Sequence, residues 1–410
     1  MASEWRQRRL GELIDNLDGR RVPVREADRR VGPYPYYGAS GVVDHVDRYL
    51  FDGEYLLIAE DGENLRTRQT PVAFLASGKF WVNNHAHIVQ GNSEADTRFL
   101  MYALSATDIS GYLTGSTMPK LTQGNLNQIP LLAPPVPEQR AIAHILGSLD
   151  DKIELNRRMN ETLEAMARAL FKSWFLDFDP VSAKANGNNL ELAAAATATF
   201  PSSFSDSAIG SIPRGWKIGR LDDIAIVVMG LSPDGDSYNS EGIGTPLING
   251  PVEFGERFPI KSKWTTAPTR MSQPGDLILC VRGSTTGRRV ISDDEYCLGR
   301  GVCAIRARDG ANTFIYQTLD SGLRQLLSNT TGSVFPSLSA PSIKGLPVLI
   351  PEEATLRAFN SLVTPITRRV NANVQSSATL RAIRDALLPK LLSGDLRVDE
   401  AERLAVKAGV

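Results

Sequence analysis

The stretch WVNNHAHIV, residues 81–89, holds the only closely spaced histidines of the sequence. His85 and His87 are two residues apart, so on a β-strand both side chains would point to one face. Three interpretations stay open: metal ligands, structural hydrogen-bonding residues, or a polar cluster that contacts bases or phosphates. A metal site needs a further ligand at a suitable spacing, and the sequence offers none. We therefore predict no metal site.

A second stretch, VRGSTTGRR at residues 281–289, is rich in glycine and arginine. A nucleotide-binding loop of the GxxxxGK[ST] type uses a lysine that this stretch lacks. The better interpretation is a glycine-rich turn whose backbone amides, with Arg282, Arg288 and Arg289, meet a phosphate backbone.

Catalytic signatures are missing from the sequence. It contains no GxSxG nucleophile turn, no HExxH helix and no paired Cys–His signature. The DPPY- or NPPF-type tetrapeptide of an adenine methyltransferase is also absent. We therefore expect a chain with no catalysis of its own.

Composition indicates a globular protein of two or three domains, with 410 residues, 42% of them hydrophobic and 22% charged. A formal net charge of −1 argues against a nucleic-acid binder that uses its whole surface, but it permits a local basic groove. The opening MASEWRQRRL has no apolar core, and no apolar run approaches a membrane span of about 20 residues. Three cysteines without CxxC spacing indicate reduced thiols, and we expect a cytoplasmic protein.

The sequence is duplicated. An offset of 217 residues aligns residues 114–175 with residues 331–392 without a gap, so that TGSTMPKL meets TGSVFPSL. A shorter match at another offset aligns Trp5 with Trp216 and Leu10 with Leu221. The segments between these anchors differ, so we predict one framework used twice around two different inserts.

The repeated tails predict two long helices. In each tail an apolar residue or an asparagine recurs every seven residues, which is the pattern of a coiled-coil seam. The seam residues are Ile142, Leu149, Asn156, Leu163, Leu170, Phe359, Ile366, Asn373, Leu380 and Leu387. The alternative is a pair of amphipathic helices packed on domain cores. Because Pro365 stands where the first copy has Ser148, we expect the second helix to start late, or to kink, near Thr364.

The inserts read as mixed α and β structure. Residues 54–59 and 276–281 are short apolar strand candidates, and residues 96–106 and 312–328 have helical spacing. Between the halves, residues 181–211 are rich in Ala, Ser, Asn and Thr, which is typical of a linker.

The chain resembles the specificity subunit of type I restriction-modification enzymes over essentially its whole length. The most specific segments are residues 124–184 and GSIPRGW at 210–216, followed by WVNNHAHIV, LGRGVCAIRA at 298–307 and LLSGDLRV at 391–398. The second helix departs from the family pattern, because it lacks the PEQ start and contains Pro365.

The resemblance implies an α+β architecture with a pseudo-twofold internal repeat. Two globular α/β target-recognition domains are separated by two long antiparallel helices that form a coiled coil. The expected segments are domain 1 (1–135), helix 1 (136–178), linker (179–209), domain 2 (210–351), helix 2 (352–398) and tail (399–410). In this arrangement we expect Asn156 and Asn373 near the midpoint of the helix pair, in adjacent layers.

The resemblance also implies a division of labour. Each domain reads one half of a bipartite, asymmetric double-stranded DNA site, and the helices set the spacer and dock two copies of the modification subunit. The modification (methyltransferase) subunits bring S-adenosylmethionine, and restriction subunits bring ATP and Mg. This chain itself carries no cofactor.

Candidate DNA contacts are chosen by residue type, because Arg pairs with guanine, Asn with adenine, and Lys, Ser and Thr with phosphate. They are Tyr36, Tyr37, Ser40, Asn64, Asn84, His85, Lys120, Arg282, Ser284, Thr285, Arg288, Arg300 and Ser333. Two other functions stay open: a scaffold without nucleic acid that carries two ligand-binding lobes on a helical hairpin, and an enzyme that uses the histidine pair or the Gly283–Gly287 loop.

Overall fold

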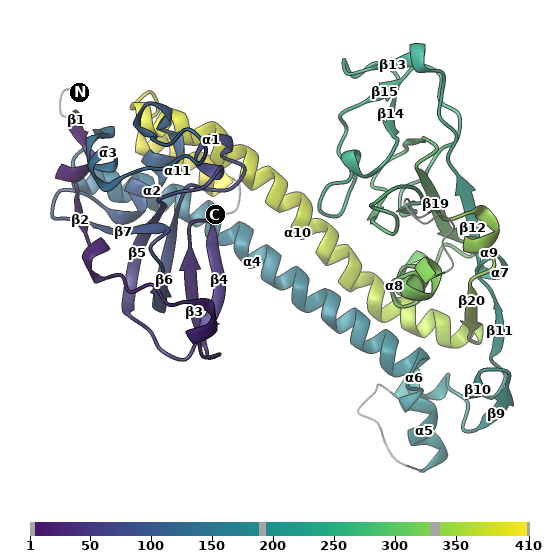
Figure 1. Cartoon of the computed structure of the whole chain (residues 1–410). Helices are drawn as coiled ribbons and strands as arrows, with labels where there is room; N and C mark the ends of the chain where they lie inside the picture. Colours follow the sequence, from purple (N-terminus) through teal and green to yellow (C-terminus); the bar gives the residue numbers. More distant parts are fainter. Residues whose placement is uncertain (1–4, 188–193, 329–336, 408–410) are drawn as a thin grey trace. The chain divides into compact units, whose positions relative to one another are not determined.

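The computed structural model describes residues 5–187, 194–328 and 337–407. The chain forms two compact units, of which unit 1 comprises residues 1–155 and 376–410 and unit 2 comprises residues 156–375. No helix in the described ranges is long and apolar enough to cross a membrane. The division falls inside both long helices, so each unit is built from both halves of the sequence (Figure 1).

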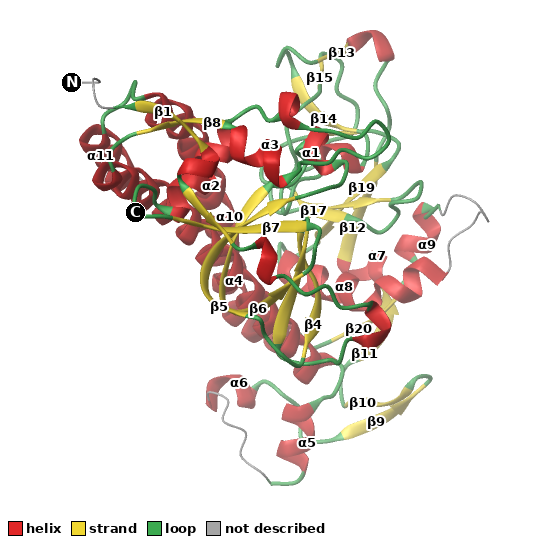
Figure 2. Cartoon of the chain, turned by 60° about the vertical axis from the view of Figure 1, so that its left-hand side comes forward, coloured by secondary structure: helices red, strands yellow, loops and turns green. Residues whose placement is uncertain are grey.

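Unit 1 contains a six-stranded sheet, drawn as curved yellow arrows in Figure 2. Its order is β2 (Ile14–Asn16), β7 (Ala86–Gly91), β5 (Phe51–Ala59), β6 (Ala73–Val82), β3 (Tyr34–Gly38), β4 (Gly41–Val46). Every neighbouring pair is antiparallel except β3 and β6.

Helix α2 (Thr97–Ala106) packs against this sheet and begins where the Asp96 carboxylate accepts two backbone N–H groups. The strand expected at residues 54–59 and the helix expected at residues 96–106 are confirmed.

Both ends of the described chain lie in unit 1 (Figure 1). Strand β1 (Arg6–Arg9) pairs antiparallel with β8 (Pro130–Ala133). The unit also contains the short helices α1 (Asn64–Thr67) and α3 (Gln123–Gln128). Helix α11 (Val398–Lys407) buries Ala401 and Ala405 in the core of the unit. The segment expected as a tail from residue 399 is thus helical in the structure, because these small apolar side chains recur at helical spacing.

Unit 2 repeats the central strands of unit 1. Its four-stranded sheet has the order β12 (Ala225–Met229), β19 (Val302–Ala307), β16 (Leu277–Cys280), β17 (Arg289–Ile291). Val227 faces Ile305 just as Asn16 faces Val89, and the order matches β2–β7–β5–β6. Strand β11 (Lys217–Arg220) pairs with β20 (Pro347–Ile350) as β1 pairs with β8.

Unit 2 contains further elements outside this sheet. A second four-stranded sheet has the order β13 (Tyr238–Asn239), β15 (Trp264–Thr265), β14 (Thr245–Ile248), β18 (Cys297–Leu298). Its helices outside the long pair are α5 (Asp179–Ala185), α6 (Ala194–Ala198), α7 (Leu221–Ile224), α8 (Asn312–Ser328) and α9 (Ala340–Lys344). The strand expected at residues 276–281 and the helix expected at residues 312–328 are confirmed.

The segment read as a linker, residues 181–211, contains structure of its own. It holds part of α5, helix α6 and strand β9 (Phe204–Ser207), which pairs with β10 (Gly210–Pro213). Val181 and Phe200 are buried in the core of unit 2, next to Trp174 and Trp216. These apolar side chains are widely spaced in a polar segment, so composition alone does not reveal their burial.

The long helices α4 (Val136–Phe175) and α10 (Glu353–Ser393) carry all ten predicted seam residues. None of the ten is exposed. In unit 1, Ile142, Leu149, Leu380 and Leu387 share one core with the sheet and α2. Both sequence interpretations therefore describe the helices, which pack on domain cores as well as on each other.

The two asparagines meet near the middle of the helices. The Asn156 amide donates to the backbone oxygen of Asn373 at 3.5 Å, and the Asn373 amide donates to Asn160 Oδ1 at 2.8 Å. Their predicted place near the midpoint is confirmed. Asn373 bonds to a side chain one turn away from Asn156, which fits adjacent layers.

Helix α10 runs without interruption through Pro365, so the expected late start near Thr364 is wrong. One face of the helix buries Phe359 and Val363 and partly buries Ile366. Each such side chain stabilises the folded state by about 1.5–3 kcal/mol. Together they outweigh the helix-interior proline penalty of about 3 kcal/mol.

We expect Pro365→Ala to raise the free energy of unfolding by about 2–3 kcal/mol, because alanine restores a backbone N–H donor for the Ser361 carbonyl. Pro365 is exposed, so no packing is lost. Thermal unfolding of the full chain measures the effect, with the exposed Ser361→Ala on the same helix as the control. An unchanged midpoint would contradict the prediction.

Candidate nucleic-acid interface

Three segments of unit 1 meet around the end of β5 and form what we call the polar rim: residues 60–62, 83–85 and 114–121. The Glu60 N–H donates to the His85 carbonyl at 2.9 Å, and the Leu121 N–H donates to the Glu60 carbonyl at 2.8 Å. The Gly62 N–H donates to the Pro119 carbonyl at 3.1 Å. The first copy of the repeated segment, TGSTMPKL at residues 114–121, is thereby hydrogen-bonded to the end of strand β5.

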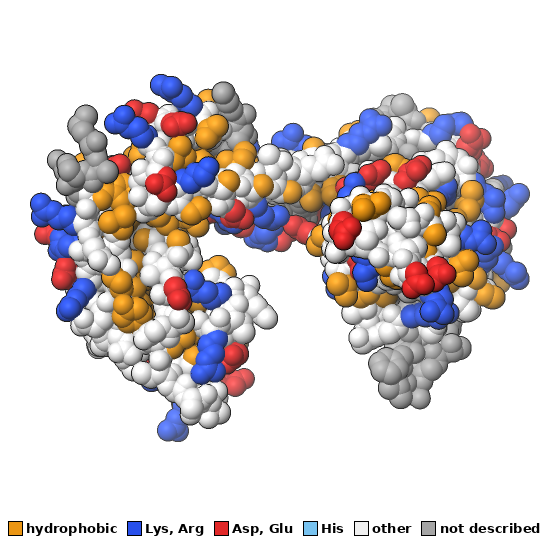
Figure 3. Space-filling view, turned by 90° about the horizontal axis from the view of Figure 1, so that it is seen from above, with side chains coloured by type: hydrophobic (Ala, Val, Ile, Leu, Met, Phe, Trp, Pro, Cys, Tyr) orange, Lys and Arg blue, Asp and Glu red, His pale blue; other side chains and the backbone are white. Residues whose placement is uncertain are grey.

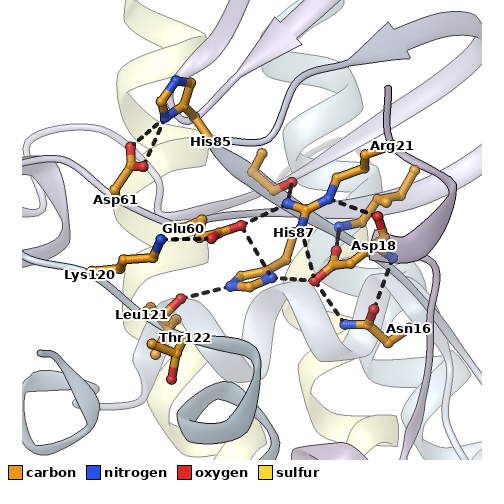
Figure 4. A network of polar contacts seen from close by, with 12 residues as sticks. Asn16, Asp18, Arg21, Glu60, Asp61, His85, His87, Lys120, Leu121 and Thr122 are labelled. Atoms are coloured by element: carbon orange, nitrogen blue, oxygen red, sulfur yellow. Dashed lines mark hydrogen bonds and ion pairs between the residues drawn. The ribbon is translucent and has the colours of Figure 1, made fainter. Parts of the chain in front are cut away.

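His87 lies beneath the polar rim on β7, with its side chain 1% exposed. Its Nδ1 is 2.6 Å from Asp18 Oδ2, and its Nε2 is 2.8 Å from the backbone oxygen of Leu121 (Figure 4). A carbonyl can only accept, so Nε2 carries a proton. The ring is thus fixed between the Leu121 carbonyl and the Asp18 carboxylate.

Burial on its own would raise the pKa of Asp18, but hydrogen bonds from His87 and the Ile88 N–H outweigh it and hold that pKa below its usual range. Burial likewise opposes ionisation of Glu60, whose pKa is nevertheless lowered by Arg21, His87 and Lys120. Arg21 donates to Glu60 Oε2 at 2.7 Å, and Lys120 Nζ lies 3.2 Å from Glu60 Oε1 (Figure 4). Both carboxylates are therefore ionised at neutral pH.

The exposed end of the polar rim is a closed turn. Thr114 and Lys120 exchange backbone hydrogen bonds of 2.8 and 2.7 Å, and Arg66 donates to the Gly115 carbonyl at 3.0 Å. Gly115 has φ +86°, and a Cβ there would lie 2.2 Å from the Met118 oxygen, so this position requires glycine. The turn presents Ser116, Thr117 and Met118 to solvent. Hydroxyls on such a turn suit contacts to phosphate or to base edges, and a lysine suits the guanine edge as well as phosphate.

Unit 2 has the same backbone arrangement around the end of β16. The Val281 N–H donates to the Gly301 carbonyl, and the Leu338 N–H donates to the Val281 carbonyl. The backbone of Arg282 forms an isolated antiparallel β-bridge with Ser337, as the backbone of Asp61 does with Lys120. The corresponding positions of the two units therefore carry different side chains.

Most predicted contact residues reach solvent. Exposed side chains are Ser40, Asn84, His85, Lys120, Arg282, Ser284, Arg288 and Arg300, and half-buried ones are Tyr37, Asn64 and Thr285. In unit 1, Asn84, His85 and Lys120 lie on the polar rim, and His85 Nδ1 is 2.8 Å from Asp61 Oδ2. Asn64 is instead engaged with the backbone of Thr70. Ser333 lies outside the described residues.

The prediction that Tyr36 contacts DNA is wrong, because this residue is 1% exposed and cannot reach DNA in this structure. Its hydroxyl accepts from the Val24 N–H at 3.1 Å, and Arg29 lies over its ring. The second tyrosine of the pair packs edge-to-face on Phe80. Alternation along β3 buries one tyrosine, and the sequence does not fix which one.

The structure agrees with the rejection of a nucleotide-binding loop at residues 281–289. A phosphate-binding loop of that type leads from a strand into a helix. Here the loop joins strand β16 to strand β17, and no helix follows it. Within the described ranges, Cys280, Cys297 and Cys303 are buried free thiols, and no group of three or more His, Cys, Asp or Glu side chains is placed to hold a metal ion.

Sequence reasoning missed Asp18, Arg21, Glu60 and Asp61. Glu60 and Asp61 directly follow the predicted strand at residues 54–59, which marks them as strand-end polar residues. Asp18 and Arg21 lie far from His87 along the chain and come beside it only when β2 pairs with β7.

On the face shown in Figure 3, Lys and Arg alternate with Asp and Glu and do not form one continuous basic patch.

The comparisons with known proteins agree on one family. The model of the type I restriction modification DNA specificity domain matches residues 2–165 and 213–355. The MjaIX specificity subunit of Methanocaldococcus jannaschii is 27% identical over 97% of this chain and 94% of its own length. The HindI specificity subunit of Haemophilus influenzae is 25% identical over 84% of each chain.

A solved S subunit of a type I restriction-modification system from M. genitalium has the same fold, with a TM-score of 0.65 and 16% identity over 94% of this chain and 96% of that one. The scaffold without nucleic acid gains no support from these similarities. The duplicated sheets, the paired long helices and the two matches of the family model lead to one conclusion: this chain belongs to the family of type I restriction-modification DNA specificity subunits.

Proposed function

We propose that this chain is a non-catalytic reader in which each unit recognises one half of a bipartite, asymmetric DNA site. The readers are residues 1–135 and residues 210–351. The observation that supports this is the repeated backbone around the ends of β5 and β16, which places unlike side chains at matching positions. Two copies of one scaffold with different polar side chains suit two different half-sites.

In this proposal the helices α4 and α10 set the spacer between the half-sites. Each has about 40 residues in one uninterrupted run, which at 1.5 Å per residue is on the order of 60 Å. Side-chain bonds attach each reader to the helices. In unit 1, Asp150 on α4 accepts from Tyr102 at 2.7 Å and from Arg384 on α10 at 2.6 Å. In unit 2, Arg257 donates to Glu164 at 2.7 Å and to Asn371 at 2.5 Å.

The Asp150 bonds stay formed at neutral pH. Burial, followed by the neighbouring Asp150 carboxylate, raises the pKa of Tyr102, so its hydroxyl keeps the proton that it donates. A reader fixed in this way to rigid helices holds its contact residues in a defined geometry.

The catalytic chemistry belongs to partners in this proposal. Two methyltransferase subunits dock on the repeated surfaces, since a pseudo-twofold repeat presents nearly the same surface twice. They supply S-adenosylmethionine, and restriction subunits supply ATP-driven cleavage with Mg, all in the cytoplasm. Because the net charge of this chain is −1, the methyltransferases contribute much of the phosphate binding.

Co-production with the methyltransferase of the same system tests the assembly. We expect a complex of two methyltransferases and one copy of this chain, measured by native mass spectrometry. Without the partner, we expect the chain to bind DNA weakly and to be poorly soluble, because its docking surface is bare. Tight, sequence-specific binding by the chain alone would contradict the proposal.

Helix length offers a second test. Inserting one heptad into α4 after Leu155 and one into α10 after Gln375, where the two units divide, preserves the seam and keeps both Arg257 partners within unit 2. Each helix becomes longer by about 10 Å. We expect the unread spacer to grow by about three base pairs at 3.4 Å each, with both half-site sequences unchanged. Methylome sequencing reads both quantities, and Leu155→Ala with Leu362→Ala, exposed on the same helices, is the length-preserving control. Altered half-site bases, or an unaltered spacer, would refute the role of the helices.

A further inference from the structure

The buried charges beneath the polar rim of unit 1 are replaced by apolar side chains at the matching positions of unit 2. Backbone hydrogen bonds show that Glu60 and Val281 occupy equivalent positions. The N–H of Glu60 donates to the β6–β7 turn and its carbonyl accepts from Leu121. The N–H of Val281 donates to the β18–β19 turn and its carbonyl accepts from Leu338, the repeat counterpart of Leu121. Ile58 and Leu279 are also equivalent, because each lies two residues before Glu60 or Val281. Ile58 pairs with His87 and Leu279 pairs with Cys303, so the counterpart of His87 is Cys303.

The same reasoning identifies the counterpart of Asp18. Asn16 faces Val89 as Val227 faces Ile305, so two residues further along the chain Asp18, just after β2, corresponds to Met229. Val281 and Cys303 are fully buried in one apolar cluster, and Met229 packs against it. Unit 2 therefore builds the same backbone around an apolar triad of Met229, Val281 and Cys303.

This internal comparison shows that the fold does not need the charges. The backbone hydrogen bond from the repeated segment to the end of the strand, Leu121 to Glu60 in unit 1 and Leu338 to Val281 in unit 2, is present in both units. Exchanging buried ion pairs for well-packed apolar residues is often neutral or stabilising, whereas ion pairs carry a desolvation penalty. A buried network kept in one unit only is therefore explained better by what it does at the surface than by stability.

At the surface the network acts on the Thr114–Lys120 turn. His87 donates to the backbone oxygen of Leu121, directly after the turn, and Glu60 holds the ammonium group of Lys120. Two carboxylates, Asp18 and Glu60, face the cations Arg21 and Lys120, and His87 Nδ1 lies 2.6 Å from Asp18 (Figure 4). The network thus links buried charged groups to a turn of exposed hydroxyls.

We propose that Asp18, Glu60 and His87 are positioning residues that fix the Thr114–Lys120 turn and Lys120, and thereby determine recognition of the half-site read by unit 1. They do not touch DNA themselves, since each is nearly or largely buried. Unit 2 reads its half-site without such a network. This inference rests on the proposed function of the two readers.

The chain supplies its own replacement set for the test. The triple variant Asp18→Met/Glu60→Val/His87→Cys installs the residues of unit 2 in unit 1. Arg21 keeps its backbone acceptors at Asp18 and Ala86, so this buried cation stays paired, whereas the exposed Lys120 loses Glu60. The matched control, Met229→Leu/Cys303→Ala, alters the corresponding apolar cluster of unit 2.

Binding is measured on the complex with the methyltransferase, using the cognate duplex and two duplexes with one half-site scrambled in each. For the triple variant we expect folding with a melting temperature close to that of the unaltered complex. Discrimination against one scrambled half-site should fall by about tenfold or more, the size of one lost base contact, and discrimination at the other half-site should stay unchanged. The control should leave both unchanged.

Lys120→Ser, the residue found in unit 2, separates positioning from general stability. If the network acts by holding Lys120, then Lys120→Ser lowers discrimination at the same half-site, and adding the triple change lowers it little further. Simple addition of the two effects would contradict the positioning role. Should the triple variant not fold, Glu60→Gln, which keeps the size of the side chain and removes its charge, provides the same readout.

Retained discrimination at both half-sites in the triple variant, or in both Glu60→Gln and Lys120→Ser, would overturn the inference, as would equal losses at both half-sites. These outcomes are distinguishable from failure of the proposed function. In that case the unaltered complex itself would not discriminate between the cognate and scrambled duplexes.

Discussion

Each unit depends on the burial of residues from both long helices in its core. In unit 1, Ile142 and Leu149 of α4 and Leu380 and Leu387 of α10 share a core with Leu56 and Val89 of the sheet. In unit 2, Phe171 and Trp174 of α4 meet Phe359 of α10 in one aromatic cluster. Neither core is complete without segments that are remote in sequence, so helix pairing and domain folding are one event in each unit.

This constraint explains why the repeat is strongest where it is. The same packing has to form twice, once in each unit. It involves the buried residues of both long helices and those of the strand pairs β1–β8 and β11–β20. Side chains at the ends of β5 and β16 do not, because the backbone hydrogen bond from Leu121 or Leu338 to the strand end is present in both units whatever side chains surround it. The packing is therefore fixed, and the exposed rim is free to differ between the units.

Periodicity was sufficient to predict the helices, because an apolar residue at every seventh position keeps one face of a helix apolar. The antiparallel packing implied by the family resemblance placed Asn156 and Asn373 together. The prediction of a late helix start failed at Pro365, where a local penalty of one residue is outweighed by the burial of its neighbours. Local rules predict a helix end from propensity, and only the tertiary contacts show how much burial opposes it.

The candidate site was less predictable for a different reason. The equivalence of the two inserts rests on strand register, and Asp18, Glu60 and His87 have no sequence resemblance to Met229, Val281 and Cys303. Residue type suggested Lys120 and His85 correctly as rim residues, but it also suggested Tyr36, which strand alternation buries. What residue type cannot supply is the pairing of β2 with β7, which brings Asp18 to His87 across the sheet.

A reader that must hold a lysine at a fixed place has two physical options. It can bury the stem of the turn in an apolar core and leave the charged end mobile, or it can extend a charged network from the core to the surface. The first keeps stability and gives up positional precision, because an exposed lysine loses much rotamer freedom on binding. The second accepts the desolvation of buried charges and reduces that loss beforehand. Unit 1 has the charged arrangement beneath Lys120. Unit 2 has the apolar one, and Ser337 stands at the matching position, so unit 2 has no lysine to hold there. The two units therefore present different rims on the same strand-end backbone.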